Sequence, residues 1–170
     1  MTQKPPYEAT WGADVLDDED WSLMMSAYGD GTATRELLNG VRTTGEVSAA
    51  LAQHLLSAVV HQSTLFPVAE PVARFLLPIC QARAELLRAL EPFWREWLEG
   101  VDVVEVEYEV APAMRDEALE AVRACAGDED ALEGLYEDVS PGSPMSVLHN
   151  YTYQQAALVR PVVVALLPNG

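Results

Sequence analysis

The stretch from His61 to Pro78, HQSTLFPVAEPVARFLLP, decides the fold of this chain. A single apolar stripe at helical spacing precedes it from Val47 onward, which indicates an amphipathic surface helix. After Pro67 the spacing is helical again, with Val68, Val72, Phe75, Leu76 and Ile79 on one face. The sequence therefore predicts a helix end at 61–64, a tight corner, and a second helix beginning near Pro67.

A related pattern occurs at 149–168, HNYTYQQAALVRPVVVALLP. Both stretches have a His followed by a Thr three residues later, an interior proline (Pro71 or Pro161) and a closing Leu-Leu-Pro. Weak repetition of helix, corner and proline-bearing helix is typical of stacked helical repeats. At two equivalent helix junctions we expect four structural corner residues that satisfy free backbone groups: His61, Thr64, His149 and Thr152.

The remaining patterns also predict helices. The acids at 17–20 precede an apolar stripe that ends at Tyr28, further helices follow Thr32 and Thr44, and another closes at Gly100. After Pro112 helical spacing resumes, with Asp128 as a cap and Pro144 in a first turn. The predicted fold is all-α, a short α-solenoid of helical repeats. It forms a single domain over 1–170, with an extended lead-in at 1–17 and helical units at 18–100 and 112–170.

The segment VDVVEVEYEV at 101–110 is different, because it alternates apolar and acidic residues from Val104 onward. Alternation with β-branched residues favours extended structure, although a buried helix remains an alternative. In an extended chain Glu105, Glu107 and Glu109 would project from one side, while Val104, Val106, Tyr108 and Val110 would pack inward. A lone strand would need a partner for its backbone groups.

Charge is the strongest compositional signal. Ten Lys and Arg stand against 27 Asp and Glu, for a net charge of −17, while 49% of the residues are hydrophobic. This composition predicts a packed core and excludes binding to nucleic acid or to an anionic membrane surface, since both need clustered cations. It suits a basic protein partner, although acids that only maintain solubility are the simpler alternative. No signal peptide or membrane span is expected.

No catalytic chemistry is predicted. Nucleophile, phosphate-binding, dinucleotide and zinc motifs are missing from the sequence. His54 and His61 are too far apart to share a metal without further ligands. Cys80 and Cys125 lie among apolar residues, which predicts reduced, buried and inert thiols and a cytoplasmic location. The acids at 17–20 and 128–130 lack the spacing of a calcium loop, so helix capping is favoured. We expect no catalytic residue, metal or cofactor.

Two stretches also resemble a known family. WSLMMSAYGDGTATRELLNGV, followed by HQSTLFPVAEPVARFLLP, is similar to a group of bacterial HEAT-repeat proteins over about residues 19–80, with a faint echo at 145–168. The matching positions are Trp21, Ala27, Tyr28, Gly29, His61, Gln62, Thr64, Phe75 and Leu76. Two positions depart from the family pattern, since Ser63 replaces a glycine and Arg74 replaces a proline.

The resemblance implies a HEAT-like module, and some such proteins are implicated as immunity proteins of polymorphic toxin systems. Combined with the charge, it predicts an immunity- or antitoxin-type protein that binds a basic protein partner, with oligomeric state left open. A stand-alone scaffold is one alternative. A HEAT-like enzyme is another, although the DNA-repair glycosylases of this type need a basic groove. The expected partner-binding residues are the acids Glu105, Glu107, Glu109, Asp17, Asp18, Asp128 and Asp130.

Overall fold

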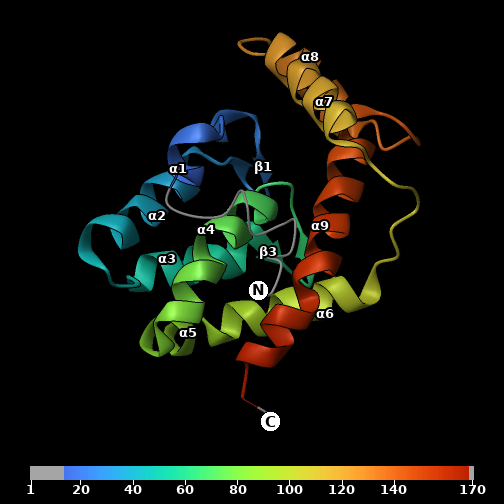
Figure 1. Cartoon of the computed structure of the whole chain (residues 1–170). Helices are drawn as coiled ribbons and strands as arrows, with labels where there is room; N and C mark the ends of the chain where they lie inside the picture. The colour runs from blue at the N-terminus through green and yellow to red at the C-terminus, as the bar shows by residue number, and fades with distance from the viewer. Residues whose placement is uncertain (1–13, 169–170) are drawn as a thin grey trace.

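The computed structural model describes residues 14–168, and this part of the chain is mainly helical (Figure 1), which confirms the coarse all-α prediction. The α-helices are α1 (Val15–Asp18), α2 (Thr32–Thr44), α3 (Ala49–His54), α4 (Ala69–Ala82), α5 (Ala84–Ala89), α6 (Glu91–Val103), α7 (Pro112–Ala124), α8 (Glu129–Glu137) and α9 (Pro144–Leu166). A 3₁₀ turn, η2, covers Trp21–Leu23, and a π-helical stretch, η3, covers Leu55–Val59. No helix within 14–168 is long and apolar enough to cross a bilayer.

The predicted corner at 61–64 is a β-hairpin. Strands β3 (Val60–His61) and β4 (Thr64–Leu65) pair antiparallel, with His61 opposite Thr64. Gln62 and Ser63 form the two-residue turn at φ 50° and 57°. Left-handed residues of this kind match the twist of a hairpin, which a helix corner would not require. Some backbone carbonyl and amide groups of the corner therefore form hydrogen bonds between β3 and β4.

No α-helix forms over the apolar stripe that ends at Tyr28, so the helix predicted there is wrong. After η2 the chain forms a second hairpin from β1 (Met25–Ser26) and β2 (Gly29–Asp30). Gly29 has φ 124°, a conformation that suits glycine and breaks helical periodicity. The acids before it do cap, because the side chain of Asp20 accepts a hydrogen bond from the Ser22 N–H at the start of η2.

His149 and Thr152 do not lie at a corner, so the predicted equivalence with His61 and Thr64 is wrong. Both lie inside α9, which continues from Pro144 to Leu166 without interruption. The Thr152 hydroxyl donates to the Leu148 carbonyl oxygen at 2.8 Å, within the same helix. Nothing between 149 and 153 forms a left-handed turn, and Pro161 lies inside the helix without ending it.

Helix α9 organises the packing. Figure 1 shows it running from α7 and α8 at one end, past α4, to α6 at the other, and it packs against all four. One hydrophobic cluster contains residues of both predicted helical units, among them Trp94, Trp97, Phe75, Tyr153 and Val163. Side chains of α9 thus belong to the same hydrophobic core as side chains of the first helical unit.

Helix α6 extends past Gly100, where the sequence predicted its end. Gly100 faces the β3–β4 hairpin, and a Cβ there would lie 2.6 Å from the carbonyl oxygen of Ser63. The glycine allows the helix backbone to approach the turn, so it acts as a packing residue. One turn earlier, the Glu96 carboxylate accepts hydrogen bonds from the Ser63 N–H at 2.7 Å and hydroxyl at 3.0 Å. These bonds offset the cost of the left-handed conformation that Ser63 adopts without being a glycine.

Candidate functional site

A cleft of about 330 Å³ opens between the β3–β4 hairpin, α8 and α9, and we call it the central cleft. Its first wall comes from the hairpins and the turn after them: Met25, Thr64, Leu65, Phe66 and Pro67. Its second wall comes from the C-terminal half: Val104, Glu105, Glu107, Tyr136, Val139, Met145, Ser146, His149 and Asn150. Four of the predicted corner and partner-binding residues meet here: Thr64, Glu105, Glu107 and His149.

The segment from 104 to 111 lies along α9 without regular secondary structure. Its backbone partners are side chains of α9. The Glu107 N–H donates to Asn150 Oδ1 at 3.0 Å, while Gln154 accepts from the Val110 N–H at 2.8 Å and donates to the Val110 carbonyl at 3.1 Å. The side-chain amides of Asn150 and Gln154 thus satisfy backbone groups for which the sequence predicted a partner strand.

The alternation of this segment is largely preserved. Glu105, Glu107 and Glu109 are exposed, Val104 and Tyr108 are half-buried, and Val110 is buried. Val106 is an exception, because it is 37% exposed where the pattern predicted an inward side chain. A bend at Tyr108 breaks the strict two-residue period. An apolar side chain therefore stands exposed between two carboxylates.

His149 forms part of the cleft wall from α9. It is half-buried and its ring centroid lies 4.7 Å from that of Tyr153. Burial lowers the pKa of His149, and the nearby Glu107 carboxylate partly opposes that shift. Burial thus favours the neutral imidazole, which offers one donor and one acceptor nitrogen at the cleft wall.

Tyr153 connects α9 to the hairpin below the cleft. It is 1% exposed, and its hydroxyl accepts a hydrogen bond from the Leu65 N–H at 2.9 Å. We expect Tyr153→Phe to lower the free energy of unfolding by about 1–2 kcal/mol, because a buried N–H loses its partner. Tyr28→Phe, at a side chain that is 71% exposed, is the control and should change it by less than about 0.5 kcal/mol. Urea unfolding of both variants measures the difference, and equal effects would show that the Tyr153 hydrogen bond does not stabilise the hairpin.

The other acids singled out from the sequence lie away from the cleft. Asp17 pairs with Arg35 at 3.3 Å and with Arg42 at 2.8 Å. The Asp128 side chain accepts from the Ala131 N–H and caps α8, as predicted. Asp18 and Asp130 are exposed in the first turns of α1 and α8. The structure thus separates these four acids from Glu105 and Glu107.

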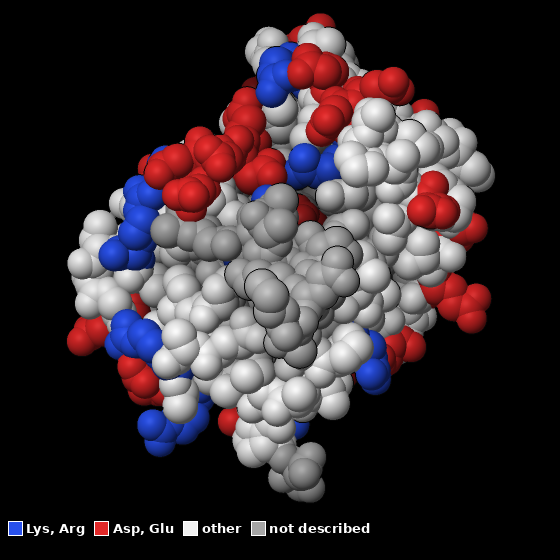
Figure 2. Space-filling view, viewed as in Figure 1, with Lys and Arg blue, Asp and Glu red and all other residues white. Residues whose placement is uncertain are grey.

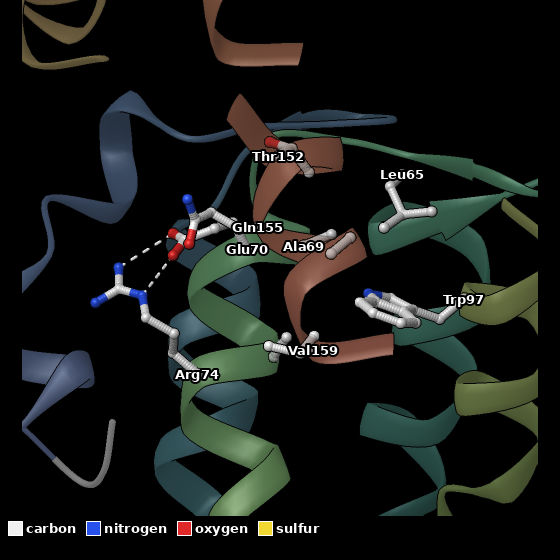
Figure 3. Close-up of a pocket in the computed structure, with 10 residues that line it drawn as sticks. Leu65, Ala69, Glu70, Arg74, Trp97, Thr152, Gln155 and Val159 are labelled. Atoms are coloured by element: carbon white, nitrogen blue, oxygen red, sulfur yellow. Dashed lines mark hydrogen bonds and ion pairs between the residues drawn. The ribbon is translucent and has the colours of Figure 1, made fainter. Parts of the chain in front are cut away.

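Helix α4 contributes to a buried ionic network that the sequence did not predict, and Figure 3 shows its Glu70–Arg74 pair. Arg74 pairs with Glu70 one turn earlier, with Nε 2.6 Å from Oε1, and also with Glu19. Arg115 of α7 lies 3.0 Å from Glu19 and 3.8 Å from Glu70, over the ring of Tyr151. The four charged side chains are between 5% and 15% exposed, and their charges cancel.

The network changes the titration of its members. Burial alone would raise the pKa of Glu19, but the charges of Arg115 and Arg74 lower it. Burial alone would lower the pKa of Arg74, but Glu70 and Glu19 raise it. Glu70 and Arg74 line a small cavity of about 20 Å³ together with Thr152 and Gln155, which Figure 3 shows next to them. This cavity has room for about one water molecule, which is too little for a small-molecule ligand beside the network.

A sequence signal for part of this network exists in retrospect. Glu70 and Arg74 are four residues apart in an otherwise apolar helix, and such a spacing places them on one face. Glu19 and Arg115 gave no comparable signal, because they come from elements far apart in the sequence. Tertiary contacts alone bring them to α4.

The two cysteines differ in environment. Cys80 is buried, and burial raises its pKa to about 11, so its thiol is protonated near neutral pH. Cys125 is only half-buried, which corrects the prediction of two buried thiols. Among residues 14–168 no group of three or more His, Cys, Asp or Glu side chains is placed to hold a metal ion.

The arginines of the described chain are mostly paired with the chain's own carboxylates. Ion pairs hold Arg35, Arg42, Arg74, Arg83, Arg95, Arg115, Arg123 and Arg160. Figure 2 shows acidic side chains gathered over α1 and toward α7 and α8, with more along the opposite edge. With 27 acids against ten Lys and Arg, the acids remain in excess after this pairing.

Comparisons of this chain with models of known protein families, with curated proteins and with solved structures find no significant match.

Proposed function

We propose that this chain is an acidic, HEAT-like protein-binding module of the immunity or antitoxin type, and that its basic partner docks over the central cleft. The observation that supports this most directly is the meeting of Glu105, Glu107 and His149 at one hollowed, mostly apolar surface. Within residues 14–168 neither Glu105 nor Glu107 forms an ion pair. Like charges held close together on a surface repel, and a basic partner relieves that repulsion.

The HEAT-like arrangement belongs to this proposal. Successive helices pack in chain order, with α2 on α3, α4 on α5 and α5 on α6, as expected for stacked helical units. Helix α9 then crosses back onto α4 and α6, which makes the module more closed than a simple stack. A closed core holds the cleft walls in fixed positions, and fixed positions lower the cost of binding.

The test is charge reversal at the cleft. We expect the double variant Glu105→Lys/Glu107→Lys to weaken binding of the physiological partner at least tenfold, mainly through slower association that depends less on salt. The partner is first isolated by affinity capture, and surface plasmon resonance then measures the rates at several salt concentrations. Both carboxylates are exposed, so the unfolding free energy should change by less than about 0.5 kcal/mol.

Glu36→Lys/Glu46→Lys is the matched control. Both residues are exposed, lie outside the cleft and give the same change in net charge. If this control slows association as much as the cleft variant, the acids act through net charge alone. Association that neither variant alters would contradict the proposal and support acids that only maintain solubility.

A further inference from the structure

The polar groups at the floor of the central cleft are already satisfied by one another. Asn150 accepts from the Glu107 N–H and donates to the Ser146 carbonyl at 2.9 Å. The Ser146 hydroxyl lies 2.8 Å from the Tyr108 hydroxyl and forms a hydrogen bond with it. These side chains hold the 104–111 segment on α9, so they have little capacity left for a ligand. Recognition must therefore come from the other lining groups.

Those other groups are apolar, charged or uncharged polar, and the uncharged polar ones are Thr64, Tyr136 and His149. Most are apolar, including Met25, Phe66, Val139 and Met145. The charged groups are the carboxylates of Glu105 and Glu107, and within residues 14–168 the lining contains no Lys or Arg. An apolar hollow beside two carboxylates complements a guest that is apolar at its tip and cationic at its flank.

The mouth of the cleft presents apolar surface to solvent. Val139 lines it and is 76% exposed. Exposed apolar side chains with a polar rim are typical of protein interaction sites. Such sites are dominated by one or two anchoring side chains that fill a pocket. With about 330 Å³, the cleft has the volume of a small ligand pocket and accommodates one bulky side chain.

On the basis of the proposed function, we infer that the central cleft binds a partner segment in which a bulky apolar residue is flanked by Lys or Arg. The apolar residue enters between Phe66 and Val139, and the flanking cations pair with Glu105 and Glu107. An all-cationic segment would leave the apolar walls in contact with water, and an acidic segment would be repelled by the carboxylates.

Three short peptides with blocked ends test this chemistry without knowledge of the partner: Lys-Phe-Lys, Lys-Ala-Lys and Glu-Phe-Glu, each between glycine and serine residues. NMR titration of the ¹⁵N-labelled chain locates the binding site and measures the affinity. We expect Lys-Phe-Lys to shift the amide signals of the cleft and to bind at least tenfold more tightly than either other peptide. Equal binding of Lys-Phe-Lys and Lys-Ala-Lys, or shifts confined to α1, would overturn the inference.

Two single variants test where the apolar side chain of the peptide binds. Val139→Ser should weaken Lys-Phe-Lys binding about fivefold to tenfold, because the exposed valine lies at the mouth and its loss removes apolar contact area. Val164→Ser changes an exposed valine of α9 outside the cleft and should leave the affinity unchanged. Equal losses in the two variants would also overturn the inference.

The outcome separates this inference from the proposed function. Failure of all three peptides to bind, with the partner still weakened by Glu105→Lys/Glu107→Lys, would reject the guest chemistry and leave the function standing. Selective Lys-Phe-Lys binding at the cleft, with partner binding unaffected by that double variant, would support the guest chemistry and reject the cleft as the docking site of the partner.

Discussion

Arg74→Met is expected to lower the free energy of unfolding by about 3–5 kcal/mol, the usual effect of removing one partner from a buried ionic network. Arg74 contacts Glu70 and Glu19, whose side chains are 5% and 14% exposed. Without it, Arg115 alone faces two buried carboxylates. The site then has an uncompensated negative charge in a poorly solvated environment. Urea unfolding at pH 7 measures the effect.

Arg95→Met is the matched control. Arg95 also pairs with a glutamate four residues earlier, Glu91, but their side chains are 44% and 30% exposed. Exposed pairs of this spacing contribute about 0.3–0.5 kcal/mol, so the control should lose no more than that. Similar losses in the two variants would show that the network on α4 does not stabilise the fold.

A double variant distinguishes charge imbalance from lost packing. Glu70→Gln/Arg74→Met leaves Glu19 and Arg115 as a neutral pair 3.0 Å apart. It should therefore recover a large part of the stability that Arg74→Met loses. If the double variant is less stable than Arg74→Met alone, packing by the Arg74 side chain is the main contribution.

Acidification should reduce the difference in unfolding free energy between the wild type and Arg74→Met. In the folded wild type the pKa of Glu19 is lowered, with Arg115 and Arg74 outweighing burial. A lowered folded-state pKa stabilises the fold above the unfolded-state value of about 4.3 and loses that stabilisation as pH falls. In Arg74→Met, protonation of the unpaired carboxylate instead stabilises the folded state, because it removes a buried negative charge. A constant gap between pH 7 and pH 3.5 would contradict the charge mechanism.

Gly100→Ala is expected to lower the free energy of unfolding by about 2–3 kcal/mol, at the upper end of what added volume in a packed site costs. The new methyl group would lie 2.6 Å from the Ser63 carbonyl oxygen and against Leu65 Cδ1. The Ser63 carbonyl oxygen is a backbone atom, so it can give way only if the hairpin turn itself moves. The hairpin would have to shift away from α6 and lose the Glu96 hydrogen bonds to Ser63.

The control for Gly100→Ala is a substitution that we expect to change the free energy of unfolding in the opposite direction. Gly134 lies in α8, and nothing is within 4 Å of the position that its Cβ would occupy. Gly134→Ala should therefore raise stability by about 0.5–1 kcal/mol, because alanine restricts the unfolded chain and favours helix. Thermal unfolding of both variants gives the comparison. A stabilising effect of Gly100→Ala would show that α6 and the hairpin are not in close contact.

The sequence by itself determined the helical elements and the chemistry of the surface. Apolar spacing of three and four residues located most helices, since only that period gives a helix one buried face. Asp128 was correctly predicted to cap α8, because the preference of Asp for that position is local. The acid-apolar alternation also predicted the exposed carboxylates at 105, 107 and 109 correctly.

Tertiary structure decided which elements meet. The His-Thr pairs at 61–64 and 149–152 look alike in sequence, yet one is in a hairpin and the other is inside a helix. The difference arises because Gln62 and Ser63 adopt left-handed conformations against α6, whereas residues 149–152 pack within continuous α9. Likewise, the charges of Glu19, Glu70, Arg74 and Arg115 become one network only when the residue after α1 meets α4 and α7. Local patterns specify a residue's own helix or turn, but the burial of a charge depends on atoms contributed by distant segments.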